Sequence, residues 1–188
     1  MSRMKSFKIV FIALFCFQLS SCQSSKPMTS TAASSTKSSS NAEGKLQNGV
    51  YFIQNLSENL VIEPYQRQYS SLTDLNMVPL DRSGIQKWVV TEYLDPKTKK
   101  PTGIYSISLF VDAHYAITNK WSNPRLGKSK EYPKDRFSIV YLEKEKAYVI
   151  KSTTAKGDCL GKSQGRFAKY VPNDSSSAIM WRFIKSDS

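Results

Sequence analysis

The chain has 188 residues, a formal net charge of +12, three cysteines and a single histidine. One histidine cannot build a histidine-based zinc site, and the thiolates that could replace the missing imidazoles are lacking as well. The composition therefore excludes a metal centre of this kind.

The first 21 residues have the pattern of a secretory signal peptide. Arg3, Lys5 and Lys8 precede an apolar run over residues 9–19 that is broken by one glutamine. The run is shorter than the ~20 apolar residues of a membrane-spanning helix, and a basic segment followed by a short apolar core and small residues is typical of an exported precursor. A buried N-terminal helix is the alternative, but the run has no polar face and the next segment has nothing apolar to pack against it.

A second motif lies at the end of this apolar run. Leu19-Ser20-Ser21-Cys22 resembles the bacterial lipobox. The resemblance implies cleavage before Cys22, a diacylglyceryl group on its thiol, and a fatty acid such as palmitate on its amine; several acyl chains anchor a protein stably, whereas one binds only marginally. The implied location is the bacterial cell envelope, and in a Gram-negative cell the outer membrane, because Gln23 rather than Asp follows the cysteine. A secreted protein cleaved near Ser21 is the alternative.

Residues 22–45 are predicted to form a disordered tether behind the lipidated cysteine. Ser, Thr, Ala and Lys dominate residues 23–45, which contain no aromatic residue, and such a segment buries too little apolar area to offset its ordering entropy. With Cys16 removed and Cys22 lipidated, Cys159 remains alone and cannot form an internal disulfide. We expect it to be a small buried apolar residue.

Residues 46–186 are predicted to form one all-β domain. Aromatic and β-branched residues become frequent here, and Gly, Pro, Asn and Asp interrupt them about every ten residues. No stretch keeps a 3.6-residue apolar period for three turns, whereas short alternating segments are common. The strand candidates are 50–53, 88–90, 104–107, 137–140, 148–150 and 181–183. Many short strands with turns between them indicate a sandwich or a barrel.

A weak threefold repeat narrows this choice. Three segments share the frame of a small or apolar residue, Tyr, any residue and Ile, each is followed by a second strand candidate, and each unit closes on an aromatic residue. The opening segments are 49–53, 103–107 and 146–150, the second strands are 60–62, 115–117 and 159–160, and the closing steps are 88–90, 137–139 and 181–183. The opening Tyr precedes the closing aromatic by 37, 32 and 33 residues.

Three such units resemble a β-trefoil, in which they build a six-stranded barrel capped by three hairpins. Gln86-Lys87-Trp88 also matches the Q-x-W signature of the ricin-type trefoil. A non-repeating β-sandwich or barrel is the alternative.

Residues for catalysis are not apparent in the sequence. His114 would have to serve any Ser-His-Asp arrangement, and we find no Gly-x-Ser-x-Gly elbow and no Gly-rich phosphate loop. Paired carboxylates such as Asp74 with Asp81 are explained more simply as charged turn residues. We therefore expect a binding protein rather than an enzyme, with no cofactor and no metal.

The ricin-type resemblance implies a carbohydrate-binding module. In that family an Asp on the second strand of a unit holds the sugar hydroxyls; carried over by motif, its positions fall near Ile62, Ile117 and Gly161, and none of these residues is acidic. The candidate ligand residues lie instead in two polar aromatic loops, where a ring can stack on a sugar and amides can bind its hydroxyls. They are Asn119, Trp121 and Asn123 in one loop and Tyr65 and Tyr69 in the other. Trp121 as core packing beneath its own hairpin is the alternative.

The basic balance suggests acidic partners as well. Without the signal peptide the net charge is about +9, and clusters of lysine and arginine fall at residues 97–100 and 125–136. They could contact acidic glycans, lipopolysaccharide or lipid headgroups through screened interactions, or serve only as solvated loops. We expect a lipid-anchored, lectin-like module that recognises a glycan; a protein-interaction module of an envelope complex or a toxin is the alternative. Nucleic acid is not an expected partner of a protein tethered outside the cytoplasm.

Overall fold

A computed structural model describes residues 44–119, 123–132, 134–155, 158–162 and 165–187. The predicted signal peptide, Cys22 and nearly all of the predicted tether lie outside the described residues, and so does Trp121. Within the described residues, no helix is long and apolar enough to cross a membrane.

The described chain forms twelve strands and three short 3-10 helices. The first unit contains β1 (Gly49–Asn55), β2 (Val61–Pro64), η1 (Tyr65–Arg67), β3 (Thr73–Val78), η2 (Gly84–Gln86) and β4 (Trp88–Leu94). The second contains β5 (Pro101–Leu109), β6 (Tyr115–Thr118), β7 (Arg125–Lys128) and β8 (Phe137–Leu142). The third contains β9 (Ala147–Ser152), β10 (Cys159–Lys162), β11 (Ala168–Val171), η3 (Ser177–Ile179) and β12 (Met180–Lys185).

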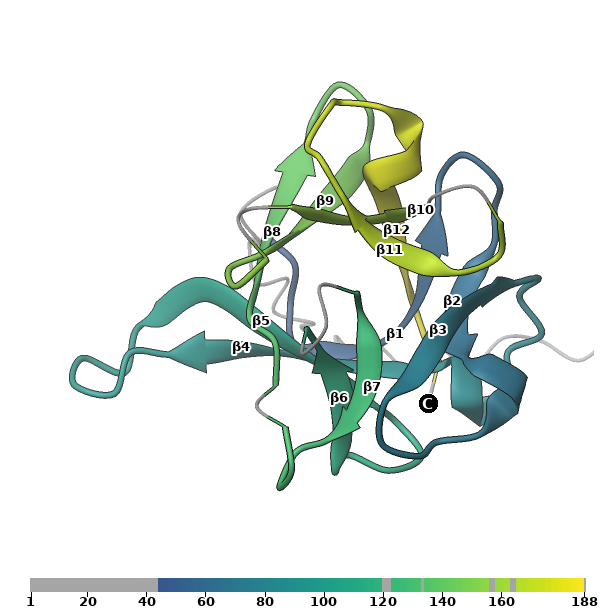
Figure 1. The fold of residues 1–188 in the computed structure, drawn as a ribbon. Coiled ribbons are helices and arrows are strands. Elements are labelled where there is room, and N and C mark those ends of the chain that lie inside the picture. Colours follow the sequence, from purple (N-terminus) through teal and green to yellow (C-terminus); the bar gives the residue numbers. More distant parts are fainter. Residues whose placement is uncertain (1–43, 120–122, 133, 156–157, 163–164, 188) are drawn as a thin grey trace, which may run out of the picture. The chain divides into compact units, whose positions relative to one another are not determined.

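Six of these strands close into a barrel. β1, β4, β5, β8, β9 and β12 pair in this order, always antiparallel, and β12 pairs with β1 to complete the ring. The other six form the hairpins β2–β3, β6–β7 and β10–β11, which are arranged around a common centre (Figure 1). A six-stranded barrel with three hairpins is a β-trefoil, so the fold predicted from the repeat is confirmed and the non-repeating alternative is wrong.

The strand register repeats with the three units. The opening tyrosine of each unit pairs with its closing aromatic residue. These pairs are Tyr51 with Trp88, Tyr105 with Phe137, and Tyr148 with Trp181. The Tyr-x-Ile frame therefore marks equivalent positions, although loop lengths differ between the units.

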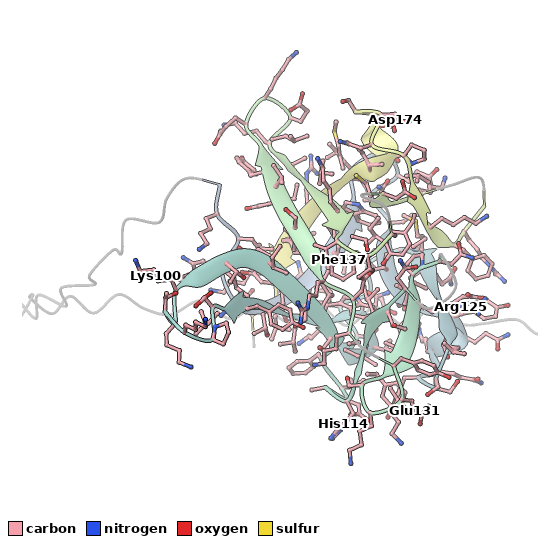
Figure 2. The ribbon with its side chains drawn as sticks, turned by 60° about the vertical axis from the view of Figure 1, so that its left-hand side comes forward. Lys100, His114, Arg125, Glu131, Phe137 and Asp174 are labelled. Atoms are coloured by element: carbon pink, nitrogen blue, oxygen red, sulfur yellow. The ribbon has the colours of Figure 1, made fainter. Side chains whose placement is uncertain are left out.

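The three closing aromatic residues occupy the centre of the core. Trp88, Phe137 and Trp181 are fully buried, and Phe137 lies in the middle of the molecule in Figure 2. The indole Nε1 of Trp88 donates to the carbonyl of Ile62 at 3.0 Å, and that of Trp181 donates to Leu160 at 2.8 Å. Burying one such side chain contributes about 1.5–3 kcal/mol. Both indoles also satisfy a carbonyl of the second strand in their unit.

Sequence alternation did not find the third strand of any unit. β3, β7 and β11 each carry a charged residue, respectively Asp74, Arg125 and Lys169, and β7 and β11 have only four residues each. They still contribute to the core, through Leu75 and Met77 on β3, Leu126 on β7 and Ala168 on β11, and each pairs with its hairpin partner. Cys159, in contrast, is fully buried as predicted.

Candidate functional site

The structure separates the residues predicted to bind a ligand. Asn119 lines a cavity, whereas Asn123, which is half-buried, lines neither of the two described cavities. Tyr65 is half-buried, and its hydroxyl accepts a hydrogen bond from Nη2 of Arg166 at 2.9 Å. Tyr69 is exposed, and its ring packs edge to face against that of Tyr115, with the two ring centres 5.7 Å apart. The two tyrosines thus have partners of their own and do not join Asn119 in one site.

Strand register gives the equivalent positions of the three units at the second strand. Val61, Ala116 and Cys159 each pair with the residue three positions after the opening tyrosine. Two positions further along the second strands lie Glu63, Thr118 and Gly161. Gly161, one of the three predicted positions, is therefore equivalent to Glu63 and Thr118 and not to Ile62 and Ile117, which lie one residue earlier, and of these equivalent residues Glu63 is acidic.

In the first unit the acidic side chain at this position is buried and already paired with protein groups. Glu63 is buried, and its carboxylate accepts a hydrogen bond from Nε2 of Gln86 at 3.1 Å. Nε of Arg67 lies 3.5 Å from the same carboxylate, and Nη2 of Arg67 contacts Asp81. The polar groups satisfy one another here.

In the third unit the same position is apolar. Ile179 stands where the first unit has Gln86, two residues before the closing tryptophan, and it is fully buried. A Cβ atom on Gly161 would lie 2.6 Å from Cγ2 of Val171 and 3.1 Å from Cγ2 of Ile179. Aliphatic side chains therefore fill the space that a polar side chain would need.

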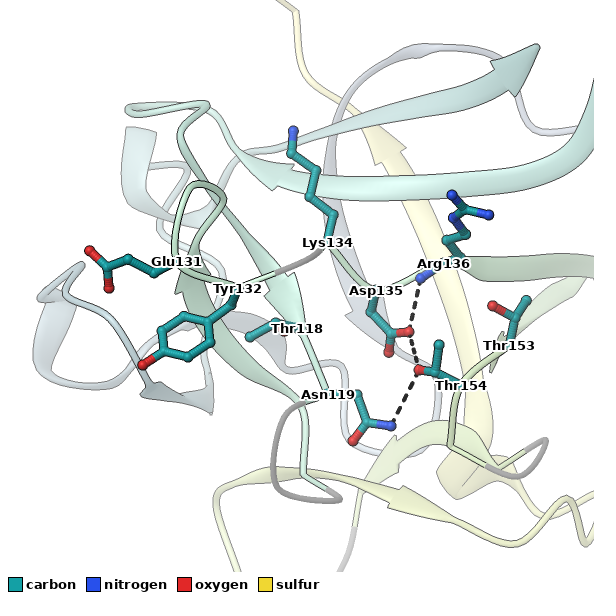
Figure 3. A pocket seen from close by; sticks show the side chains of 9 residues that line it. All are labelled: Thr118, Asn119, Glu131, Tyr132, Lys134, Asp135, Arg136, Thr153 and Thr154. Atoms are coloured by element: carbon teal, nitrogen blue, oxygen red, sulfur yellow. Dashed lines mark hydrogen bonds between the residues drawn. The ribbon is translucent and has the colours of Figure 1, made fainter. Parts of the chain in front are cut away.

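The second unit has a cavity beside this position. Its volume is about 580 Å³, a size common for small-molecule sites. Figure 3 shows the side chains around it. The lining residues are Thr118, Asn119, Glu131, Tyr132, Lys134, Asp135, Arg136, Thr153 and Thr154. They come from the end of β6 and the residue after it, from the segment between β7 and β8, and from the turn after β9.

A buried carboxylate organises one wall of this cavity. Asp135 is only 3% exposed and occupies the position of Gln86. It accepts hydrogen bonds from the backbone of Arg136 at 2.8 Å, from Oγ1 of Thr154 at 2.6 Å and from Oγ of Ser152 at 3.0 Å. The hydroxyl of Tyr170 donates to it as well. A buried charge needs such partners, because an unpaired one is strongly unfavourable.

This network joins the second unit to the third. Tyr170 lies on β11 and Ser152 at the end of β9, whereas Asp135 precedes β8. Burial raises the pKa of Tyr170 well above its ordinary value, and the negative charge of Asp135 raises it further. The tyrosine therefore remains a hydrogen-bond donor at physiological pH.

Asn119 offers an amide group to the cavity. Its Nδ2 donates to Oγ1 of Thr154 at 3.4 Å (Figure 3), which links the amide to the Asp135 network. Its Oδ1 is buried and accepts no hydrogen bond from the described residues. A buried acceptor without a donor is unfavourable, so a turn of the Asn119 side chain that brings this oxygen to a hydroxyl or N–H donor of a ligand in the cavity would be favourable.

Gly127 allows a close approach of side chains at the opposite wall of the cavity. A Cβ atom at this position would lie 2.5 Å from Cγ2 of Thr118 and 3.3 Å from Cβ of Tyr132. Glycine on β7 therefore lets the hairpin bring Thr118 and Tyr132 together at the cavity.

Sequence reasoning missed Asp135, Thr154 and Tyr132. A signal was present, because Asp135-Arg136-Phe137 stands in the second unit where Gln86-Lys87-Trp88 stands in the first. The signature there has a shorter acid in place of Gln and Phe in place of Trp.

The described residues do not form a metal site, since no three His, Cys, Asp or Glu side chains among them gather as ligands. His114 is exposed, and its Nδ1 lies 2.9 Å from Oδ1 of Asp112, two residues earlier in the same turn. The backbone N–H of His114 lowers the pKa of Asp112. The pair lines neither described cavity.

Solved structures match this arrangement over most of the chain. The Rhizoctonia solani agglutinin has a TM-score of 0.60 at 15% identity, over 76% of this chain and 98% of the agglutinin. The BEL β-trefoil has a TM-score of 0.58 at 12% identity, over 77% of this chain and 98% of that protein. This chain has the β-trefoil fold. SeviL bound to asialo-GM1 saccharide also matches, with a TM-score of 0.55 at 13% identity, over 74% of this chain and 99% of SeviL.

Sequence comparisons add nothing to this fold assignment. No protein-family model matches the chain, and no curated protein matches it significantly. Similarity to the solved trefoils at 12–15% identity concerns the fold.

Proposed function

We propose that this trefoil is a lectin-like module that binds a glycan in the cavity of its second unit. The observation that carries the proposal is a cavity of about 580 Å³ lined by polar side chains, among them Asn119, whose amide oxygen has no donor among the described residues. A sugar hydroxyl is a donor of the right kind, and a site built to bind a hydroxyl discriminates strongly against ligands that lack it. The trefoil fold of an agglutinin and of a saccharide-bound protein supports the same class of ligand.

The other wall residues complete such a site. Thr153 supplies a hydroxyl and Tyr132 an aromatic side chain, which commonly contacts the apolar face of a ligand. Nζ of Lys134 donates to Oγ of Ser108 at 3.1 Å. Asp135 has its acceptor positions occupied by protein donors. Its role is therefore to fix Thr154, and through it Asn119, rather than to contact the sugar.

Binding assays on the full-length protein in detergent test this proposal. On a glycan array we expect saturable binding that Asn119→Ala weakens at least about tenfold, because it removes the amide that the hydroxyl would contact. Asn173→Ala is the matched control, since Asn173 is exposed and lines neither described cavity. Trp121→Ala tests the remaining aromatic candidate of the same loop. An array without signal, or equal binding by the Asn119 and Asn173 variants, would contradict the proposal. A partner protein recovered by mild crosslinking together with a blank array would favour the protein-interaction alternative.

We further propose that the module is displayed at the bacterial envelope by lipid on Cys22. The basic and apolar segments before it and the match of Leu19-Ser20-Ser21-Cys22 to the lipobox support this proposal. Cys22→Ser should abolish labelling with a fatty-acid analogue and release or misprocess the protein. A variant that remains membrane-bound and lipid-labelled would refute the anchor while leaving the glycan site untouched.

A further inference from the structure

A second cavity lies next to the first. Its volume is about 500 Å³, and it is lined by Tyr93, Leu94, Pro96, Thr102, Ile104, Arg136 and Thr153. Arg136 and Thr153 line both cavities. The two cavities are therefore neighbours with part of their lining in common.

The β4–β5 hairpin forms the outer part of this second cavity. It projects from the barrel in Figure 1, and Lys100 lies near its end in Figure 2. β5 has nine residues, against six in each of β8 and β9. The register between β4 and β5 shifts between Glu92 and Leu94, around Tyr93. Such irregularities re-aim side chains and are frequent next to binding sites.

The hairpin presents apolar groups that the barrel does not use. Leu94 is 54% exposed, and it lines the cavity beside Tyr93, Pro96 and Ile104. Exposed apolar groups around a hollow, rather than scattered singly, are typical of a ligand surface. These groups suit the apolar face of a sugar ring, but a polar group is also needed to fix the orientation of the sugar. Thr102 is the polar residue of the hairpin that lines this cavity, and its Oγ1 already donates to the carbonyl of Tyr93 at 2.7 Å.

Arg136 supplies the missing polar group. Its guanidinium carbon lies 5.3 Å from the centre of the Tyr93 ring, and stacking of this kind orders the side chain while its N–H groups stay available. Among the described residues no carboxylate forms an ion pair with Arg136. The adjacent Asp135 receives the backbone N–H of Arg136 and is occupied by the network described above.

The nearby hairpin acid is occupied as well. Oδ1 of Asp95 accepts the backbone N–H groups of Lys97 at 3.0 Å and Thr98 at 2.6 Å. The N–H of Thr98 lowers the pKa of Asp95 and keeps it ionised within its own turn. Lys97, Lys99 and Lys100 are exposed on the same turn. The available charges around the second cavity are therefore positive.

We propose that the ligand is an anionic oligosaccharide that spans both cavities, with its carboxylate or sulfate on Arg136 and an adjoining sugar ring against Tyr93 and Leu94. This inference rests on the proposed glycan site at Asn119 and specifies its ligand. A guanidinium binds carboxylate or sulfate oxygens through two parallel N–H groups, which gives orientation as well as affinity.

Paired probes that differ only in charge test the inference. The full-length protein in detergent is titrated with acidic tetrasaccharides (galacturonate, glucuronate-containing and sulfated) and with their carboxyl-reduced or desulfated counterparts. We expect at least one acidic member to bind about tenfold or more tightly than its neutral counterpart, as for a hydrogen bond to a charged group. Arg136→Gln should remove this preference, so that the variant binds the acidic member and its neutral counterpart with affinities within about twofold of each other. Lys169→Gln removes the same charge from an exposed position on β11 outside both described cavities and should leave the preference intact.

Ligand length and the aromatic wall give a second readout. Tyr93→Ala should lower affinity for the acidic tetrasaccharide but not for the corresponding monosaccharide, and Tyr93→Phe should restore it, since the ring remains. This inference is overturned if neutral glycans bind in an Asn119-dependent manner and acidic ones bind no more tightly. It is also overturned if a preference for acidic glycans exists but Arg136→Gln leaves it unchanged. Either result would leave the proposed function standing. No binding to any probe or array glycan would overturn both.

Discussion

The hydrogen bond between Tyr170 and Asp135 is predicted to couple the second and third units energetically. Asp135→Ala leaves the hydroxyl of Tyr170 without its charged acceptor, whereas Oγ of Ser152 keeps Oγ1 of Thr154 at 3.1 Å, and Thr154 is exposed to water. A buried group left unpaired costs about 1–3 kcal/mol, so the variant should lose about 1–3 kcal/mol of unfolding free energy. Most domains have 5–15 kcal/mol in total, and the variant should remain folded in water.

A double-mutant cycle isolates the pair. Tyr170→Phe in the natural protein removes a donor to a charged acceptor and should cost about 1.5–3 kcal/mol. In the Asp135→Ala background the same change removes a hydroxyl that has already lost its partner, so the cost should be near zero. The coupling energy is therefore expected to be about 1.5–3 kcal/mol, large for two side chains in contact.

Urea unfolding followed by tryptophan fluorescence measures all four proteins, because Trp88 and Trp181 are buried in the shared core. If Tyr170→Phe lowers the unfolding free energy by the same amount in both backgrounds, to within about 0.5 kcal/mol, the two side chains are not coupled and the prediction is wrong. A cycle of Asp135→Ala with Tyr65→Phe is the control, since the Tyr65 hydroxyl bonds Arg166 and not this network.

Three further predictions concern the core. Trp88→Phe should cost about 1–3 kcal/mol in urea unfolding, because the carbonyl of Ile62 loses its indole donor; a cost below about 0.5 kcal/mol would show that this bond contributes little. Phe137→Trp adds volume to a fully buried position and should cost about 1–3 kcal/mol and weaken glycan binding, and an unchanged stability and affinity would contradict that. Burial, and next the charge of Glu92, raise the pKa of Tyr105 to about 12, so the unfolded chain loses this proton first. The corresponding stability is present below pH ~10 and is lost as the pH rises through about 12; unfolding free energies measured across this range should fall less in Tyr105→Phe.

The sequence predicts the barrel well because the barrel positions repeat. Tyr51, Tyr105 and Tyr148 open equivalent strands, and burial on one side of each strand leaves the alternating pattern that reveals it. The third strands carry a weaker signal, because β7 and β11 have four residues each and one buried core side chain apiece, Leu126 and Ala168. β3 directs Leu75 and Met77 into the core but also carries Asp74, which Arg125 on β7 bonds at 2.7 Å where the two hairpins pair.

The cavity was only partly predictable, for a physical reason. Asn119 stands in a loop whose composition suggests binding, and it does line the cavity. Asp135 and Thr154 contact each other across nineteen positions of sequence, and nothing in the spacing indicates that contact. Composition also could not indicate that Tyr65 is held by Arg166, more than a hundred positions away.

The cavity of the second unit is connected with the choice of Phe137 over tryptophan. In the first and third units an indole N–H satisfies the second-strand carbonyl, and a 3-10 turn leads into the closing strand. Phenylalanine has no donor, and the equivalent carbonyl of Ile117 instead accepts the backbone N–H of Asp135 at 2.9 Å. That bond holds the segment before β8 against β6, so the side chain of Asp135 reaches Ser152 and Thr154 on the neighbouring unit. One aromatic substitution within a threefold frame thus goes together with a different backbone route, a buried carboxylate and a cavity lined by Asn119.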